Sequence, residues 1–210
     1  MLKLYDDPDS GNGYKARLLL ALLGQPYDLV EVNAIQGETR REAFLTKNPN
    51  GRIPVLELED GTFLPESNAI LFYLAEETAY LPADSLGRAR ALQWMFFEQY
   101  SHEPYVAVLR FWARHTDKTR ENEAQWAERE KRGYDALGVM ERTLTEQHWL
   151  LGGTPSIADI SLYAYTHVAD QGGLDLSRFP ALRAWIDRFP DLEGYVPFSG
   201  RLRATDDRKA

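Results

Sequence analysis

Three short segments in the first third of the chain carry the polar groups that could bind a ligand. The first, Asp9-Ser10-Gly11-Asn12-Gly13-Tyr14-Lys15, lies just before an apolar run with helical character. Its glycines allow a tight turn and close approach of a ligand to the backbone. Ser10 supplies a hydroxyl and Asn12 an amide at the expected start of a helix, where exposed N–H groups favour an anion. The same residues can also form an ordinary helix cap.

The second segment is Asn48-Pro49-Asn50-Gly51-Arg52-Ile53-Pro54-Val55. Pro54 stands where a strand is expected to begin, so its missing N–H costs little there. An Ile-Pro peptide bond can be cis at modest cost. A cis bond would turn the N–H and C=O of Ile53 outward, where they could pair with an extended peptide. A trans proline at the start of a strand is the alternative, and the sequence does not separate the two.

The third segment is Leu64-Pro65-Glu66-Ser67-Asn68-Ala69-Ile70, in which Glu66 and Ser67 are expected to open a helix. A carboxylate and a hydroxyl at this position can simply cap the helix. They could equally bind a zwitterion. Glu66 would then take an ammonium group, while Ser67 and its N–H would take a carboxylate.

The elements that must position these segments form two different patterns. Residues 1–78 alternate between strands, expected at 2–5, 27–32, 54–58 and 62–64, and helices, expected at 14–23, 37–47 and 66–77. This order predicts a mixed sheet covered by helices. Residues 79–86 are typical of a linker. From residue 87 to 210 the helical period dominates, with helices expected at 87–115, 119–147, 156–169 and 178–189. Pro104 is expected to kink the first of them.

The composition excludes several classes of function. The 210 residues contain no cysteine, so disulfides, thiolate metal sites and a protein thiol nucleophile are ruled out. The formal net charge of −8 argues against a nucleic-acid partner. No apolar stretch approaches the roughly 20 residues that a membrane helix needs, and the N-terminus lacks the pattern of a signal peptide. The four histidines show no metal-ligand spacing, so no metal is expected. These features favour a cytoplasmic protein.

Taken together and in this order, the three segments resemble the cytosolic glutathione transferase family. The resemblance implies a thioredoxin-like N-terminal domain over residues 1–78 and an all-helical C-terminal domain over 87–210 that contributes the pocket for an electrophile. Ile53-Pro54 matches the cis-proline position of the family, and Glu66-Ser67 matches its site for the γ-glutamyl end of glutathione. Ser156-Ile157-Ala158-Asp159 matches its helical capping signature, which makes Asp159 a structural residue. By weaker analogy, Arg52 or Gln36 would meet the glycyl carboxylate.

The resemblance offers different donors for activating the glutathione thiol. One group of the family uses a tyrosine at the end of the first strand, where Tyr5 stands, and another uses a Ser or Thr at the start of the first helix, where Ser10 stands. The segment Ser10-Gly11-Asn12-Gly13-Tyr14-Lys15 is most similar to a bacterial, nu-like subgroup that reads Thr-Pro-Asn-Gly-x-Lys. We therefore expect Ser10 to be catalytic with Asn12 as its partner. Tyr5 is expected to pack under the sheet.

The expected function is a glutathione transferase that activates the glutathione thiol for attack on small electrophiles, by conjugation or peroxide reduction. Glutathione would be a co-substrate, and a homodimer is expected from the same resemblance. One alternative is a glutathione-dependent disulfide reductase, which could work without a protein cysteine by using two glutathiones. A second alternative is a non-catalytic, transferase-like interaction module. Such modules often lose the Glu-Ser pair or the donor on the first helix, and both are present here.

Overall fold

The computed structural model describes residues 1–198, which divide into two compact units. The first unit comprises Met1–Leu74 together with the C-terminal segment that begins at Pro190, and the second comprises Ala75–Phe189. Each unit is considered by itself. The sequence places a boundary at residue 78, a linker at 79–86 and every later residue in the helical domain. The structure differs because the segment from Pro190 packs on the first unit: the Tyr14 hydroxyl donates a hydrogen bond to the carbonyl of Val196 at 2.7 Å.

A four-stranded sheet forms the centre of the first unit, with strand order β2-β1-β3-β4. The strands are β1 (Leu2–Asp6), β2 (Tyr27–Glu31), β3 (Val55–Glu57) and β4 (Phe63–Pro65). β1 pairs with β2 in parallel, while β3 is antiparallel to both β1 and β4. The parallel pair requires a crossover, which α1 (Gly11–Leu22) supplies. The expected mixed sheet of a thioredoxin-like domain is confirmed.

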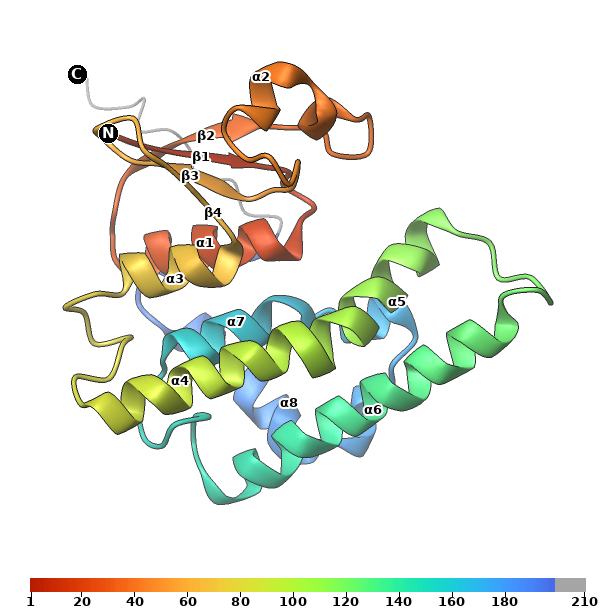
Figure 1. The fold of residues 1–210 in the computed structure, drawn as a ribbon. Helices are drawn as coiled ribbons and strands as arrows, with labels where there is room; N and C mark the ends of the chain where they lie inside the picture. The colour runs from red at the N-terminus through yellow and green to blue at the C-terminus, as the bar shows by residue number, and fades with distance from the viewer. Residues whose placement is uncertain (199–210) are drawn as a thin grey trace, which may run out of the picture. The chain divides into compact units, whose positions relative to one another are not determined.

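The two faces of this sheet are covered by different helices, as Figure 1 shows. Side chains alternate along β1, so Leu4 and Tyr5 point to opposite faces. Leu4 belongs to a core with Ala16 and Leu20 of α1 and with Ile70 of α3 (Ser67–Leu74). On the other face, Tyr5 packs against a smaller cluster made of Val32, Val55 and Phe44 of α2 (Glu42–Leu45). The helix expected at 37–47 is thus a short α2 preceded by a 3₁₀ turn at Glu38–Arg40.

The second unit is helical, as expected. Its α-helices are α4 (Ser85–Phe97), α5 (Glu103–His115), α6 (Glu123–Glu146), α7 (Ile157–Thr166) and α8 (Pro180–Ile186). α7 is buried along almost its whole length. Asp159 fixes its start, because its carboxylate accepts hydrogen bonds from the Ser156 N–H at 2.9 Å and from the Trp185 indole at 3.0 Å. The predicted capping box and the structural role of Asp159 are confirmed.

The first long helix of this unit is interrupted just before Pro104. A π-helical turn at Glu98–His102 separates α4 from α5, and Pro104 occupies the first turn of α5. Proline at this position needs no N–H donor, so the irregular turn ahead of it absorbs the break. The expected kink is present as a change of helix type. No helix within residues 1–198 is both long and apolar enough to cross a membrane.

Candidate functional site

Ser10 forms the N-terminal cap of α1. Its backbone is extended, with φ of −80° and ψ of 122°, and its Oγ accepts a hydrogen bond from the Gly13 N–H at 3.1 Å. The Ser10 N–H in turn donates to the carbonyl of Asp7 at 2.8 Å, which tightens the loop before the helix. A hydroxyl that accepts a bond from the backbone can still donate its own proton to a ligand. The capping interpretation of Ser10 is therefore confirmed, and it is compatible with a ligand at the same helix end.

Asn12 and Ser67 meet although they lie in different helices. The Ser67 hydroxyl, which is 5% exposed at the start of α3, donates to the side-chain oxygen of Asn12 at 3.2 Å. Lys15, which is fully buried in α1, lies with its Nζ 3.5 Å from the same hydroxyl. The first turns of α1 and α3 contain no acidic residue. Two helix N-termini and a buried ammonium group therefore favour an anion at this place.

Glu66 adopts a backbone conformation that is unusual for its residue type. Its φ is +75°, and within residues 1–198 it shares positive φ among non-glycine residues with Glu77 alone. The side chain is exposed, directly before Ser67 at the start of α3. Left-handed backbone at a residue other than glycine costs free energy and concentrates at functional sites. Glu66 therefore combines an exposed carboxylate with a strained backbone directly before Ser67.

The Ile53-Pro54 peptide bond is cis, as predicted. The turn before it is held by side chains from nearby positions. The Asn48 amide donates to the carbonyl of Arg52 at 2.7 Å, and the Arg40 guanidinium donates to the carbonyl of Asn50 at 3.1 Å. Pro54 itself is buried, and the Ile53 side chain packs against the cluster beneath α2.

Gln36 and Arg52 lie apart from the contacts that join Asn12 to Ser67. Both side chains are exposed in loops, and within the described part of the chain neither makes a hydrogen bond or an ion pair. Among residues 1–198, Gln36 bonds only through its backbone N–H, which donates to the side-chain oxygen of Asn33 at 2.9 Å. Their assignment to the glycyl carboxylate therefore stays a prediction.

Tyr5 lies on the face of the sheet that α2 covers, opposite the face that packs against α1 and α3. Its hydroxyl donates to a carboxylate oxygen of Glu57 at 2.6 Å, and its ring meets those of Phe44 and Phe63 edge-on. Partial burial and the hydrogen bond to Glu57 raise the pKa of Tyr5 to about 12. A phenol that already donates to a carboxylate is a poor donor for a thiolate. The expectation that Tyr5 packs under the sheet is confirmed.

Three buried charged residues around α1 are not among the site residues that the sequence predicts. Lys15 contacts Ser67, and Asp6 forms an ion pair with Arg17, whose Nε lies 3.2 Å from a carboxylate oxygen of Asp6. Lys15 follows Asn12 by three positions, which places both on one helix face, so its spacing was a usable signal. Arg17 gave no such signal, because only the fold shows that its side chain reaches back to the loop before α1.

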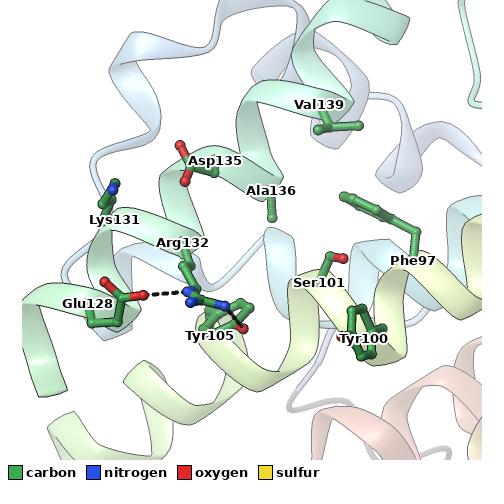
Figure 2. Close-up of a pocket in the computed structure, with 10 residues that line it drawn as sticks. All are labelled: Phe97, Tyr100, Ser101, Tyr105, Glu128, Lys131, Arg132, Asp135, Ala136 and Val139. Atoms are coloured by element: carbon green, nitrogen blue, oxygen red, sulfur yellow. Dashed lines mark hydrogen bonds and ion pairs between the residues drawn. The ribbon is translucent and has the colours of Figure 1, made fainter.

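The helical unit contains a separate cavity of about 460 Å³. Figure 2 shows residues that line it. Phe97, Tyr100 and Ser101 form part of its wall, and α6 contributes charged residues. Arg132 is already engaged there, since it donates to the Tyr105 hydroxyl at 2.9 Å and pairs with Glu128. None of the site residues predicted from the sequence lines this cavity.

The donors at the α1 and α3 N-termini define the chemistry of the site. They are hydroxyl, amide, ammonium and backbone N–H groups, with Glu66 as the accessible carboxylate. Such a set can bind a small zwitterion that also carries an extra anionic group. Among residues 1–198, no cluster of three or more His, Asp or Glu side chains is arranged to hold a metal ion.

A thioredoxin-like sheet with a cis-proline, followed by a helical unit, defines the class of the protein. The N-terminal domain of glutathione S-transferase matches residues 1–76, and the C-terminal domain of glutathione S-transferase matches residues 123–188. The chain belongs to the glutathione S-transferase family. A glutathione S-transferase from Pseudomonas fluorescens Pf-5 is 53% identical, with a TM-score of 0.92 over 94% of this chain and 98% of that chain.

Other relatives differ in the reactions that their names describe. Maleylacetoacetate isomerase of Pseudomonas aeruginosa is 32% identical over 89% of this chain and 90% of that protein. The disulfide-bond oxidoreductase YfcG of Escherichia coli is 31% identical over 90% of this chain and 89% of that protein. A glutathione transferase from Burkholderia graminis has two glutathione molecules bound per subunit. It is 30% identical, with a TM-score of 0.82 over 94% of this chain and 85% of that chain.

Proposed function

We propose that the protein binds glutathione across the first unit and activates its thiol. The observation that carries this proposal is the hydrogen bond between Ser67 and Asn12, which joins the N-termini of α3 and α1. The γ-glutamyl end would lie at Glu66 and Ser67, with the carboxylate at the hydroxyl and N–H of Ser67 and the ammonium at Glu66. The cysteinyl backbone would pair with Ile53, and the sulfur would lie near Ser10 and Asn12. The exposed Gln36 or Arg52 would meet the glycyl carboxylate.

Activation means that the bound thiol must lose its proton more readily than in water. A free thiol has a pKa of ~8.5, and lowering it by about two units needs roughly 2.7 kcal/mol of differential stabilisation. A hydrogen bond to a charged acceptor contributes about 1.5–3 kcal/mol, and a helix dipole about 0.3–1 kcal/mol. Ser10 supports this role because its Oγ already accepts from Gly13, which leaves the hydroxyl proton to be donated to the thiolate.

The leading reaction is attack of the thiolate on a small electrophile. In conjugation, sulfur forms a bond to carbon while the leaving group departs with its electron pair. In peroxide reduction, sulfur attacks the outer oxygen and the O–O bond breaks, so that the alkoxide leaves and takes up a proton while glutathione becomes a sulfenic acid. A second glutathione then attacks the sulfenic acid, giving oxidised glutathione and water. The donors Ser10 and Asn12 together with Glu66-Ser67 favour an enzyme over a non-catalytic module. We further propose the nu-like type, because the segment from Ser10 to Lys15 keeps the Asn, Gly and Lys of that subgroup's pattern. It differs in having Ser for Thr and Gly for Pro. Detoxification in the cytoplasm is the role proposed.

Disulfide reduction is the second candidate. It is favoured by the Burkholderia graminis relative, which carries two glutathione molecules per subunit, and by the Escherichia coli disulfide-bond oxidoreductase. A first glutathione thiolate would attack the disulfide, releasing one thiolate and forming a mixed disulfide. A second would attack that mixed disulfide, giving oxidised glutathione and the other thiolate. The chain contains no cysteine, so both reducing sulfurs must come from glutathione.

Calorimetric titration with glutathione tests binding, and three assays then separate the reactions. An aromatic halide reports conjugation, an organic hydroperoxide reports peroxide reduction, and a small disulfide reports reductase activity. We expect saturable binding and turnover in at least the first two assays. Turnover of the disulfide alone would establish the second candidate. Binding without turnover in any assay would favour the interaction module, and absence of binding would refute the proposal.

We also propose that the protein forms a homodimer, in line with the family resemblance. Support comes from large aromatic side chains left exposed in the helical unit, where Phe96 is 68% exposed and Tyr100 is 84% exposed. Phe96 and Tyr100 are four positions apart along one helical segment, so they are neighbours on its surface, and contiguous exposed apolar surface marks interaction sites. Sedimentation at micromolar concentration tests the proposal, and a mass near the 24.0 kDa of one chain would contradict it.

A further inference from the structure

A buried ion pair lies directly behind the loop that carries Ser10. Asp6 ends β1 and is fully buried, while Arg17 belongs to α1 and is 3% exposed. The Arg17 Nε lies 3.2 Å from a carboxylate oxygen of Asp6. Burying two charges is costly unless they are paired and held by further contacts, so a buried pair often serves to fix a specific arrangement. The remaining contacts of the two side chains show which arrangement this is.

Arg17 holds the backbone of the loop. Its Nη2 donates to the carbonyl of Pro8 at 2.9 Å and to the carbonyl of Ser10 at 3.3 Å. Both acceptors lie N-terminal to the helix, so the guanidinium reaches back from the second turn of α1 across its first turn. A planar guanidinium can donate to several acceptors at once. The position of the Ser10 main chain therefore depends directly on Arg17.

Asp6 acts on the same residue through Gly13. A Cβ added at Gly13 would lie 1.6 Å from an oxygen of the Asp6 carboxylate, so the carboxylate fills the space beside this glycine. The Gly13 N–H is the donor to Ser10 Oγ, at 3.1 Å. Arg17 therefore contacts Ser10 directly, by donating to its carbonyl, and Asp6 acts on it indirectly, by packing against the residue whose N–H donates to the Ser10 hydroxyl.

We propose that Asp6 and Arg17 are positioning residues for the Ser10 hydroxyl in thiolate formation: Arg17 holds the loop and places a positive charge behind it, whereas Asp6 packs beside Gly13 and partly compensates that charge. The inference rests on the proposed function, because it gives Ser10 a role toward the glutathione sulfur. Neither side chain is assigned a contact with glutathione. Their effect acts through the loop backbone and through charge.

The charge of this pair varies with pH. Burial raises the pKa of Asp6 to about 7, with a smaller contribution in the same direction from the negative charge of Asp7. The Arg17 charge and the hydrogen bond from the Asp7 backbone lower it, but by less. Tyr27 on β2 also interacts with both charges, and burial raises its pKa. Below neutral pH the Arg17 charge is therefore less compensated than above it.

The test measures the pKa of the thiol of bound glutathione, from the ultraviolet absorbance of the thiolate, in wild type, Arg17→Met and Asp6→Asn. Arg17→Met removes the positive charge and the loop clamp, so the thiol pKa should rise by about one unit. Asp6→Asn keeps the shape at Gly13 but leaves the Arg17 charge uncompensated, so the thiol pKa should fall. Opposite signs distinguish a positioning and charge role from general damage, which would move both variants the same way.

Kinetics and a matched control complete the design. Arg17→Met should lower kcat roughly tenfold to a hundredfold with little change in the glutathione KM, and Arg17→Lys should recover part of the loss. Arg110→Met is the control, because Arg110 is also buried, at 7% exposed, but binds Gln171 in the helical unit. It should lower the unfolding temperature without shifting the thiol pKa.

The outcomes separate this inference from the proposed function. Wild-type protein that fails to lower the glutathione thiol pKa would refute the proposed function. Wild-type protein that lowers it, with Arg17→Met unchanged or Asp6→Asn shifted upward, would refute only the positioning pair. If Arg17→Met does not fold, Asp6→Asn decides alone: a downward shift supports the pair, and an unchanged or higher thiol pKa overturns it.

Discussion

The hydroxyl of Ser67 donates a hydrogen bond to the side-chain oxygen of Asn12 at 3.2 Å, although 55 positions separate them in the sequence. The bond turns the oxygen of the Asn12 amide toward α3, so its NH₂ group faces another direction. The proposed γ-glutamyl site and the proposed sulfur site therefore share one contact. A change at Ser67 should be felt at both ends of glutathione.

Ser67→Ala should raise the glutathione KM and also lower kcat, by roughly threefold to tenfold each, because one hydrogen bond is worth about 0.5–1.5 kcal/mol. The KM effect comes from the lost carboxylate ligand, and the kcat effect from an Asn12 amide that is no longer oriented. Steady-state kinetics at varied glutathione provide the measurement. Ser67→Thr keeps the hydroxyl and serves as the control. A change confined to KM would contradict the shared contact.

Ser10 is tested by two variants that remove the same hydroxyl. Ser10→Ala and Ser10→Gly should lower kcat equally, by roughly tenfold to a hundredfold, since a hydrogen bond to a charged acceptor contributes about 1.5–3 kcal/mol. They should differ in stability. Alanine at the cap costs about 1 kcal/mol, whereas glycine costs only a few tenths. Chemical denaturation and kinetics on the same samples separate the two roles, and a rate that follows stability would show that Ser10 is only a cap.

Tyr5→Phe should leave kcat and KM unchanged. The phenylalanine keeps the ring contacts with Phe44 and Phe63 and loses only the hydrogen bond to Glu57, which also pairs with Lys3. Loss of activity in Tyr5→Phe together with a nearly silent Ser10→Ala would reverse the catalytic assignment and make this a tyrosine-type enzyme.

Glu66 combines a strained backbone with a proposed contact to the glutathione ammonium group. Glu66→Gly and Glu66→Ala should raise the glutathione KM to a similar extent, with kcat nearly constant, because the group they lose contacts a part of glutathione that does not react. Glycine at φ of +75° relieves strain, so the free energy of unfolding of Glu66→Gly should exceed that of Glu66→Ala by about 1 kcal/mol. Its unfolding temperature should be correspondingly higher. Equal stability of the two variants would mean that the backbone there carries no strain.

The raised pKa of Asp6 makes stability depend on pH. Because its folded pKa of about 7 lies above the ordinary value of 3.8, the folded state holds this proton more tightly than the unfolded state does. The free energy of unfolding of wild type should therefore fall relative to Asp6→Asn as pH rises from about 4 to about 7, by about 2–4 kcal/mol. Urea unfolding at several pH values provides the measurement. A difference that is constant across this range would contradict the raised pKa.

Local patterns carried most of what the sequence could predict. The Ser10 cap and the capping box at Asp159 each depend on a few adjacent residues, so the residue types alone indicate them. The residue types left the Ile53-Pro54 bond open between cis and trans, and the resemblance to the family predicted the cis form that the structure has. The mixed sheet followed from the order of apolar runs. The position of Tyr5 could be argued only by comparison with the family, and the structure supplies the reason in its bond to Glu57.

What the sequence could not predict depends on distant contacts. Lys15 and Arg17 look like the polar face of a surface helix, and only the approach of Ser67 and Asp6 shows that both are buried. The π-helical turn at Glu98–His102 depends on how the strain of Pro104 is distributed along the helix. A helical period gives no information on the return of the last described residues to the first unit.

That return also affects how the protein is made. The Tyr14 hydroxyl binds the carbonyl of Val196, its ring meets the ring of Phe198 edge-on, and Gly194 packs against the backbone of Ala21. While a ribosome adds about 5–20 residues per second, the first 74 residues wait on the order of ten seconds for the segment that begins at Pro190. The helical unit is fully synthesised before the sheet unit is. A nascent chain therefore exposes the uncovered surface around Tyr14 to chaperones and proteases until the segment that begins at Pro190 has been synthesised.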